Sequence, residues 1–325
     1  MIRRFARLTG AVALVAASFI VIEARAQQDV PAAPSAPAPT APVFPKPDPA
    51  NFTASTPTVE TINAFLHTSW GYDPDRMWQV QAILKTPVEG VSKIVILVAE
   101  KTGDQKVQAA QFFTLPDGKH ILAADDIIPF GEHPYADARA ELQQHADGPY
   151  RGNASKDLEL VEFADFQCPH CKDAQANMEK LATDFPKARI IFQNYPLEKI
   201  HPASVTAASY SVCVAKQGGS AAFFSYADAV FDSQAGLSTA DGVTLTLNSA
   251  VTKAGLDPAK IAACAATPEA KSQVEASVKL AQHLSINQTP TLMINGRPVP
   301  IGGVPYETLK KIIEFQAKLD GVATN

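Results

Sequence analysis

Two cysteines separated by two residues are the strongest chemical signal in this sequence. Cys168-Pro169-His170-Cys171 forms a C-x-x-C motif where a predicted strand passes into a predicted helix. Disulfide exchange needs a thiolate as the attacking group, or a leaving group that is stable as a thiolate. The first free N–H groups of a helix favour negative charge, so this position should lower the pKa of Cys168. The motif therefore predicts a redox-active cysteine pair.

The residues around the two sulfurs fit the same chemistry. Pro169 occupies a first helical turn, where its missing N–H is not needed, and a protonated His170 can place positive charge beside Cys168. The i, i+3 spacing puts both sulfurs on one face, and we expect Cys168 to be exposed and Cys171 to be shielded. Glu162, on the incoming strand, has two interpretations: a buried carboxylate that exchanges protons with Cys171, or an edge residue that reaches water.

The other two cysteines, Cys213 and Cys264, fall in an alanine-rich helical stretch that opens at His201. Four cysteines allow three pairings, but if Cys168–Cys171 is the redox pair, a structural Cys213–Cys264 disulfide follows. The alternative for the C-x-x-C is half of a zinc site, which needs a second closely spaced ligand pair. Since no such pair is present, we expect no metal and no cofactor. His201 is either a polar turn residue or a neighbour of the active site.

The elements that position the motif follow the order β-α-β, a long helical stretch, and β-β-α. This is the order of a thioredoxin fold in which a helical domain is inserted between the two halves. The helical stretch, about 202–284, has breaks near Gly218-Gly219, Ser233–Ser238 and Asp257-Pro258. The expected strands are Leu158–Phe163, Ala188–Tyr195, Thr291–Asn295 and Val299–Ile301, and the flanking helices are Asp173–Asp184 and about Pro305–Leu319.

A small α+β domain is expected before the catalytic one. It combines a helix, Val59–Leu66, with four strands, Gln79–Lys85, Ser92–Ala99, Gln105–Thr114 and His120–Ala123, and a polar helix, Tyr135–His145, then connects to the second domain. The sequence thus divides into a signal peptide (1–26), a Pro/Ala-rich linker (27–57), a small α+β domain (58–132), a connecting helix and linker (133–153), and a thioredoxin-like domain (154–325).

The N-terminal residues are typical of an export signal. Three arginines precede an apolar run from Gly10 to Ile22, and Ala24-Arg25-Ala26 supplies a small-x-small cleavage pattern. The run is short for a membrane span of about 20 residues, so an uncleaved anchor is the second interpretation. The chain has a net charge of −5, and cleavage would make it more acidic, which disfavours nucleic-acid binding. In an extracytoplasmic space such as the periplasm, its disulfides would persist.

The C-P-H-C motif is identical to the signature of the DsbA family of the thioredoxin superfamily, and the chain resembles that family elsewhere. Asn287-Gln288-Thr289-Pro290-Thr291 precedes a late strand, where the family carries a cis-proline loop facing the active site. The resemblance implies that Pro290 is this cis-proline and that Thr289 offers backbone groups to a substrate. Leu160-Val161-Glu162-Phe163 resembles the incoming strand, with its acidic position. The resemblance covers about residues 156–319 and implies a thiol:disulfide oxidoreductase.

Two directions of catalysis remain open. The C-P-H-C motif and the helical insertion resemble the oxidases, which the family implies are reoxidised by a DsbB-like membrane partner. The small N-terminal domain is arranged as in periplasmic disulfide isomerases, which dimerise through it and are kept reduced by a membrane reductant, and Thr289 is common there. We favour an oxidase acting on exported proteins that contain cysteine. The alternatives are a dimeric isomerase or reductase, and a chaperone-like binding module without catalysis.

Overall fold

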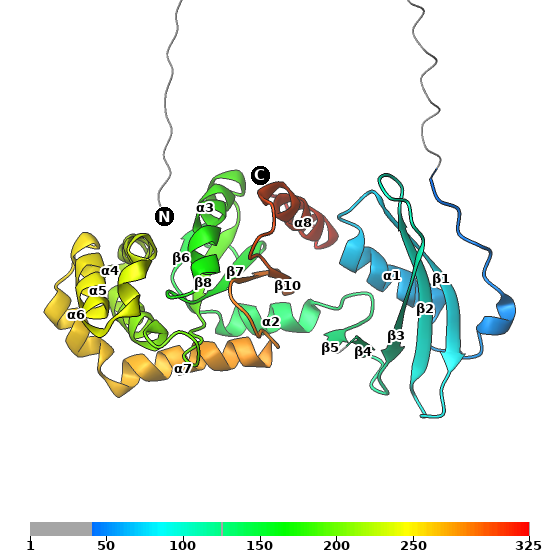
Figure 1. Cartoon of the computed structure of the whole chain (residues 1–325), viewed down its shortest axis with the longest axis horizontal. Coiled ribbons are helices and arrows are strands. Elements are labelled where there is room, and N and C mark those ends of the chain that lie inside the picture. Colours follow the sequence, from blue (N-terminus) through cyan, green and yellow to red (C-terminus); the bar gives the residue numbers. More distant parts are fainter. Residues whose placement is uncertain (1–40, 125, 325) are drawn as a thin grey trace, which may run out of the picture. The chain divides into compact units, whose positions relative to one another are not determined.

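The structure, a computed structural model, describes residues 41–124 and 126–324 (Figure 1). The predicted signal peptide, 1–26, and residues 27–40 of the predicted linker lie outside the described residues. Two five-stranded sheets belong to the same structural unit, which begins at Ala41. Within the described ranges, none of the helices is long and apolar enough to cross a membrane.

The first sheet is an antiparallel meander of five strands in sequence order. Short turns connect its strands, as antiparallel pairing permits. The fifth strand was not predicted, because its four residues end in proline; pairing with Ile121 and Leu122 brings it into the sheet. The strands are β1 (Arg76–Lys85), β2 (Ser92–Glu100), β3 (Gln108–Thr114), β4 (His120–Ala123) and β5 (Asp126–Pro129).

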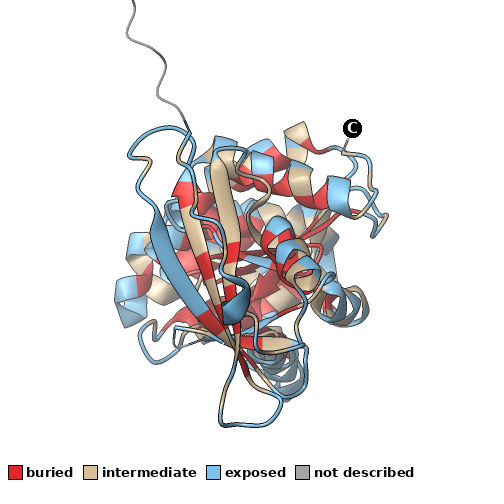
Figure 2. Cartoon of the chain, turned by 90° about the vertical axis from the view of Figure 1, so that its right-hand side faces the viewer, coloured by how far each residue is buried: buried red, intermediate tan, exposed pale blue. Residues whose placement is uncertain are grey.

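Helix α1 (Val59–Trp70) packs on this sheet through one apolar face. It begins after Thr58, whose hydroxyl accepts a hydrogen bond from the backbone N–H of Thr61 at 3.1 Å. Ile62 and Leu66, four residues apart, lie on the buried side of the helix. In Figure 2 buried positions are interspersed with less buried ones along the strands. The strand residues of this core are Val80, Ile83, Ile94, Ile96, Phe112 and Ile121.

The stretch just before α1 is held against the sheet. Pro49–Asn51 form the short 3-10 helix η1, and Phe52 forms an isolated bridge with Ile83 of β1. The Ser92 hydroxyl donates a hydrogen bond to the carbonyl oxygen of Thr56 at 2.6 Å. The predicted linker, 27–57, therefore ends earlier than expected, because its last residues are bonded to β1 and β2.

Both tryptophans lie in this N-terminal part of the chain. Trp70 ends α1 and Trp78 is on β1, with their ring centroids 6.2 Å apart in an edge-on arrangement. The guanidinium of Arg76 lies 5.5 Å from the centre of the Trp70 ring, and the Trp78 indole N–H donates to the Asn63 side chain at 3.3 Å. The two indoles thus form one cluster.

The second sheet carries the cysteine motif at the end of its central strand. Its order is β10-β9-β7-β8-β6, and β7 pairs parallel with β8 and antiparallel with β9. All six residues of β7 are buried, as expected for a strand covered on both faces. Strand β6 was predicted as a loop because it is only three residues long. The strands are β6 (Tyr150–Gly152), β7 (Glu159–Ala164), β8 (Arg189–Asn194), β9 (Thr291–Ile294) and β10 (Arg297–Pro300).

Helices cover both faces of this sheet. On one face, α3 (Pro169–Asp184) and α8 (Tyr306–Leu319) pack against alternate residues of β7, β8 and β9, among them Leu160, Ile190 and Leu292. On the other face, α2 (Ala136–His145) and α7 (Pro268–His283) pack against Val161, Phe163, Ile191 and Met293. The two hydrophobic layers fix the position at which β7 ends and the C-x-x-C motif begins.

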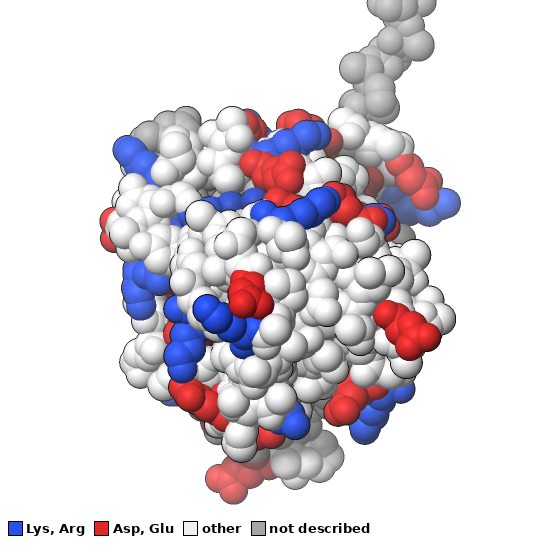
Figure 3. Space-filling view, turned by 90° about the vertical axis from the view of Figure 1, so that its left-hand side faces the viewer, with Lys and Arg blue, Asp and Glu red and all other residues white. Residues whose placement is uncertain are grey.

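The helical insertion packs on the second sheet, at the end where the cysteine motif lies. Its helices are α4 (Ser204–Asp232), η2 (Gln234–Ser238), α5 (Ala240–Lys253), α6 (Pro258–Ala265) and α7. The predicted break at Gly218-Gly219 is a kink inside α4, where Gly219 has φ 71°. The Phe166 ring stacks on that of Phe192, with the ring centroids 5.2 Å apart, and its centroid lies 5.3 Å from that of Phe231. These aromatic contacts join the sheet to the insertion. The face that Figure 3 shows, on the side of these helices, carries scattered charges on a mostly uncharged surface.

From β7 onward the order of elements is β-α-β, four α-helices with the short 3-10 helix η2, and β-β-α. It is preceded by α1 with the antiparallel first sheet, and then by α2 and β6. This confirms the predicted fold class, a thioredoxin fold with an inserted helical domain after a small α+β part. The boundaries between the predicted segments, apart from the end of the linker, stay predictions.

Candidate active site

The two cysteines of the C-x-x-C motif lie at the beginning of α3. Cys168 is the N-cap residue, with an extended backbone (φ −75°, ψ 121°), and Pro169 occupies the first turn. Cys171 has no exposed surface, but Cys168 is only 5% exposed, so the prediction of an exposed Cys168 is wrong. The reason is contacts made by distant residues. The Cys168 sulfur lies 3.6 Å from the carbonyl oxygen of Thr289, and the Gln234 amide donates to the Cys168 carbonyl at 2.9 Å.

The environment of Cys168 favours its thiolate. Its pKa is lowered to about 5, chiefly because the thiol of Cys171 donates a hydrogen bond to it. Thr289 and the backbone N–H groups of His170 and Cys171 lower it further, while burial opposes them. His170 therefore acts through its backbone at the helix N-terminus, and its exposed imidazole, predicted as the source of positive charge, is not among the main causes.

Cys171 is perturbed in the opposite direction. Burial raises its pKa above that of an ordinary thiol, and the adjacent Cys168 raises it further. The backbone N–H of Asp165 lies 3.4 Å from its sulfur and lowers the pKa, which only partly offsets the burial. In the reduced pair, negative charge therefore resides on Cys168 and the proton on Cys171.

Glu162 is the buried carboxyl group of this site. It is 2% exposed on β7, so the interpretation as an edge residue that reaches water is wrong. Burial raises its pKa to about 7, while the charge of Arg151 acts to lower it. The amide of Gln175 donates to the Glu162 carboxyl and to the Cys171 carbonyl, each at 3.0 Å. Glu162 is therefore joined to the first turns of α3, and its charge contributes to the raised pKa of Cys171.

The loop before β9 faces the cysteine pair. The Thr289–Pro290 peptide bond is cis, and the Pro290 carbonyl accepts a hydrogen bond from the Ile301 N–H at 3.0 Å. Gly302, next to Ile301, lies close to both Pro290 and His170: a Cβ atom there would be 3.8 Å from the Cδ of Pro290 and 3.7 Å from the Cβ of His170. The carbonyl of Thr289 thus faces Cys168 from a segment 121 positions later in the chain.

Sequence reasoning missed Asp165 and did not place His201. Asp165 is 1% exposed in the turn between β7 and Cys168, and its carboxylate lies 2.8 Å from Nδ1 of His201. The only signal in the sequence is an acidic residue three positions before the motif, and nothing in it links that residue to a histidine 36 positions later.

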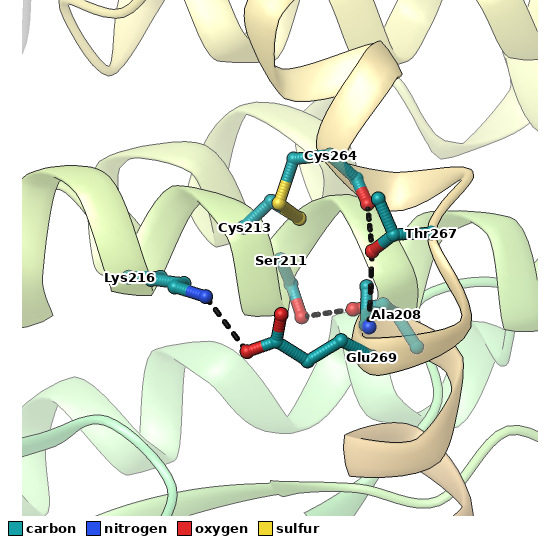
Figure 4. Close-up of a disulfide and its surroundings, with 8 residues drawn as sticks. Ala208, Ser211, Cys213, Lys216, Cys264, Thr267 and Glu269 are labelled. Atoms are coloured by element: carbon teal, nitrogen blue, oxygen red, sulfur yellow. Dashed lines mark hydrogen bonds and ion pairs between the residues drawn. A yellow bond between two sulfur atoms is a disulfide. The ribbon is translucent and has the colours of Figure 1, made fainter.

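Cys213 and Cys264 form a disulfide that joins α4 to α6, with a Cα–Cα distance of 6.0 Å (Figure 4). Nearby, Lys216 and Glu269 form an ion pair at 2.8 Å that connects α4 to α7. Cys213 belongs to the same hydrophobic cluster as Cys168 and Cys171. Among the described residues, no group of three or more His, Cys, Asp or Glu side chains is arranged to hold a metal ion.

Curated relatives match part of the chain. They include Na(+)/H(+) antiporter NhaA 3 of Salinispora tropica, 29% identical over 147 residues, and Na(+)/H(+) antiporter NhaA 1 of Mycolicibacterium vanbaalenii, 30% identical over 149 residues. The alignments cover 45% of this chain and 21% and 23% of those proteins. The chain therefore spans about a fifth of the length of these relatives.

Several solved structures are similar to the chain. A thioredoxin-like oxidoreductase from Silicibacter pomeroyi is 25% identical with a TM-score of 0.46, covering 55% of this chain and 98% of that one. ScsC of Proteus mirabilis in a transitional conformation is 23% identical with a TM-score of 0.46, covering 56% and 81%. The thiol-disulfide exchange protein alpha-DsbA2 of Wolbachia pipientis is 22% identical with a TM-score of 0.46, covering 55% and 95%.

The family comparison covers the segment that holds the site. A family model described as Thioredoxin matches residues 144–315, which is more than half of the chain and includes the cysteine pair, the helical insertion and the cis-proline loop. With the β-α-β, helical, β-β-α order around a C-x-x-C at a helix N-terminus, this match confirms the predicted superfamily: the chain belongs to the thioredoxin family.

Proposed function

We propose that this chain is an exported thiol:disulfide oxidoreductase that exchanges disulfides with secreted proteins, mainly as an oxidase. The observation that carries the proposal is the opposite perturbation of two adjacent thiols. The pKa of Cys168 is lowered to about 5, while the pKa of Cys171 is raised. A pair of this kind has one sulfur that is a stable thiolate and one that stays protonated, which suits disulfide exchange.

The exchange proceeds in two steps. A substrate thiolate attacks the Cys168 sulfur of the Cys168–Cys171 disulfide, so that a new S–S bond forms to the substrate and Cys171 leaves as a thiolate. A second substrate thiolate then attacks the substrate sulfur of the mixed disulfide, and Cys168 leaves as a thiolate. The substrate loses two electrons in forming its disulfide, and the cysteine pair gains them. The low pKa of Cys168 makes it a good leaving group in the second step.

Two neighbouring residues support these steps. The carbonyl of Thr289, beside the Cys168 sulfur, belongs to a loop whose backbone can align an extended substrate segment. Glu162 has a pKa of about 7, so at neutral pH it exists in both protonation states and can give a proton to Cys171 and take it back. These roles are part of the proposal.

The electrostatics of the reduced pair support the oxidase direction. Groups that stabilise the Cys168 thiolate stabilise the reduced form, and they make the disulfide a stronger oxidant. After each cycle the pair must be reoxidised, and we assign this to a DsbB-like membrane oxidant. The export signal expected at residues 1–26 and the Cys213–Cys264 disulfide suit an oxidising space such as the periplasm.

A dimeric isomerase or reductase is the second candidate. The observation that favours it is the outer part of the N-terminal sheet, where Leu122 of β4 and Ile127 and Ile128 of β5 expose apolar side chains. An exposed apolar edge of a sheet can pair with a second copy of the chain. Analytical ultracentrifugation of the purified chain distinguishes the dimeric isomerase from the oxidase. A monomer at micromolar concentration would contradict the dimeric isomerase, and a dimer would favour it.

The deciding experiment is an equilibrium redox titration of the Cys168–Cys171 pair against glutathione, with the Cys213–Cys264 disulfide intact. We expect a potential well above that of thioredoxin, about −270 mV, and nearer to about −120 mV. A potential at or below thioredoxin's contradicts the oxidase. If the reduced Cys168 also fails to react with a thiol reagent, the chaperone-like binding module replaces the enzyme.

A further inference from the structure

Asp165 connects the C-x-x-C turn to the segment that opens the helical insertion. Its carboxylate accepts hydrogen bonds from the backbone N–H of Gln167 at 2.7 Å and of Leu197 at 2.8 Å. Nδ1 of His201 lies 2.8 Å from the same oxygen that Leu197 reaches. The side chain is fully enclosed, so these three donors replace the water that the carboxylate loses on folding.

The backbone of Asp165 contacts both sulfur-bearing residues. Its carbonyl oxygen accepts a hydrogen bond from the Cys168 N–H at 3.1 Å. Its own backbone N–H points toward the Cys171 sulfur, with the nitrogen 3.4 Å from that sulfur. One residue therefore carries an anchored side chain and a backbone donor aimed at the resolving cysteine.

His201 holds this arrangement from the side of the insertion. Its side chain is 16% exposed, in the turn between β8 and α4. Its own backbone is fixed: its N–H donates to the Leu197 carbonyl at 2.9 Å, and its carbonyl accepts from the Ser204 hydroxyl at 2.7 Å. Because an ionised carboxylate only accepts, Nδ1 carries the proton in this contact. The charge-assisted bond therefore ties a rigid turn to Asp165.

We propose that Asp165 and His201 are positioning residues for Cys171: their contact holds the Asp165 N–H against the Cys171 sulfur and stabilises the thiolate that forms when Cys171 leaves the disulfide. The inference rests on the proposed function. Cys171 departs into an apolar, buried environment, where a fixed donor stabilises new negative charge strongly. The donor matters least when Cys171 is a neutral thiol or a disulfide sulfur, so it affects rates more than the final equilibrium.

The variants for the test are His201→Ala, which removes the donor to Asp165, and His201→Asn, whose amide N–H replaces the Nδ1–H. Asp165→Asn tests the other partner of the contact. It also places an amide N–H group among backbone N–H donors that need an acceptor, so this variant can fail to fold. The matched control is His120→Ala, because His120 and Asp117 form a second His–Asp contact, at 2.6 Å, on the exposed surface of the N-terminal sheet. Each variant is oxidised, checked for its melting temperature, and mixed with reduced glutathione.

The measured quantity is the rate at which glutathione opens the Cys168–Cys171 disulfide. Samples are quenched with acid at successive times, the free thiol is labelled with a maleimide, and the labelled fraction is determined by mass spectrometry. For His201→Ala we expect the opening rate and the rate of ring closure to fall about tenfold, or about 1.4 kcal/mol in activation free energy. The equilibrium constant with glutathione should change less than about threefold, because the two rates fall together. His201→Asn should recover most of the rate, and His120→Ala should match the unchanged chain.

Three results would overturn the inference while leaving the proposed function intact. These are an unchanged rate in His201→Ala, a loss that His201→Asn does not recover, and a loss only as large as the unfolded fraction of that variant. The proposed function itself fails separately, if the unchanged oxidised chain reacts with glutathione no faster than a simple linear disulfide does.

Discussion

The sulfur of Cys168 lies 3.6 Å from the carbonyl oxygen of Thr289, although 121 positions separate the two residues in the chain. The first residue begins α3 after the central strand, and the second precedes β9, which pairs with that strand. The reactive sulfur is therefore placed between the two halves of the thioredoxin fold. Its chemistry therefore depends on contacts from both halves.

The thiolate of Cys168 should depend on the Cys171 thiol. The rate at which iodoacetamide alkylates Cys168 in the reduced chain should rise with a midpoint near pH 5, since the pKa is about 5. The hydrogen bond from Cys171 is the largest cause of the lowered pKa. Cys171→Ala should therefore move the midpoint toward about 8.5, the value of an ordinary thiol. Cys171→Ser keeps a donor and should stay closer to pH 5; equal midpoints in the two variants would contradict this account.

Burial of Glu162 should make the chain less stable at neutral than at acidic pH. Its pKa is about 7 in the folded chain and about 4.5, the ordinary value of a glutamate side chain, in the unfolded chain. The unfolded chain therefore loses this proton first, and stability falls as pH rises from about 4.5 to about 7. Glu162→Gln should remove a penalty on the order of 3 kcal/mol at pH 7.5 and little at pH 4. Urea unfolding at both pH values measures it.

The control for this experiment is Glu275→Gln, because Glu275 is exposed on α7 and its removal leaves the site untouched. A stability difference between the unchanged chain and Glu162→Gln that stays constant from pH 4 to pH 7.5 would show that burial does not shift the titration of Glu162. The effect would then come from packing alone.

The Cys213–Cys264 disulfide should stabilise the fold without setting the redox potential. The two residues are 51 positions apart, so the disulfide restricts a long loop of the unfolded chain. In the chain-entropy model, the double variant Cys213→Ser, Cys264→Ser should lose about 4 kcal/mol of unfolding free energy. The potential of the Cys168–Cys171 pair should stay the same. A shifted potential in a folded variant would mean that the shared hydrophobic cluster links the two pairs.

Arg297, the first residue of β10 at the edge of the second sheet, should matter for stability. Its guanidinium is buried and donates hydrogen bonds to the carbonyl oxygens of Thr68 and Ser69, in the last turn of α1. A cation there satisfies carbonyls that have no partner within the helix. Arg297→Met should lower the unfolding free energy by about 3 kcal/mol, as two bonds to a charged donor are lost.

Hydrogen exchange locates this effect. Amides of the last turn of α1 should exchange faster in Arg297→Met than in the unchanged chain, and the Cys168 alkylation profile should not move. Arg297→Lys keeps the charge without the planar two-nitrogen geometry and should give an intermediate result. Equal exchange rates in α1 would exclude this role of Arg297.

Local features of the site could be predicted from the sequence, and contacts between distant segments could not. Residues that are adjacent in the sequence are enough to recognise the C-x-x-C motif, the incoming strand and the Thr289-Pro290 pair. The burial of Cys168 was missed because Thr289 and Gln234 approach from 121 and 66 positions away. The Asp165–His201 contact was missed for the same reason, since both residue types are also common in solvated turns.

The fold shows the same division. Long apolar segments such as β2 and β7 were predicted close to their observed bounds, because their patterns extend over several residues. The short strands β5 and β6 have three or four residues each, and only pairing with β4 and β8 makes them strands. The last residues of the linker were misjudged because a proline-rich composition does not reveal the bridge between Phe52 and Ile83.

The clustering of Trp70 and Trp78 on α1 and β1 determines what intrinsic fluorescence can report. Both indoles of the chain belong to the N-terminal sheet and its helix, while the cysteine pair begins α3 on the other sheet. Opening and closing the Cys168–Cys171 disulfide should leave the emission spectrum nearly unchanged, whereas melting of the first sheet should shift it strongly. The two tryptophans are thus a natural optical probe of one half of the chain that does not respond to the redox state of the other.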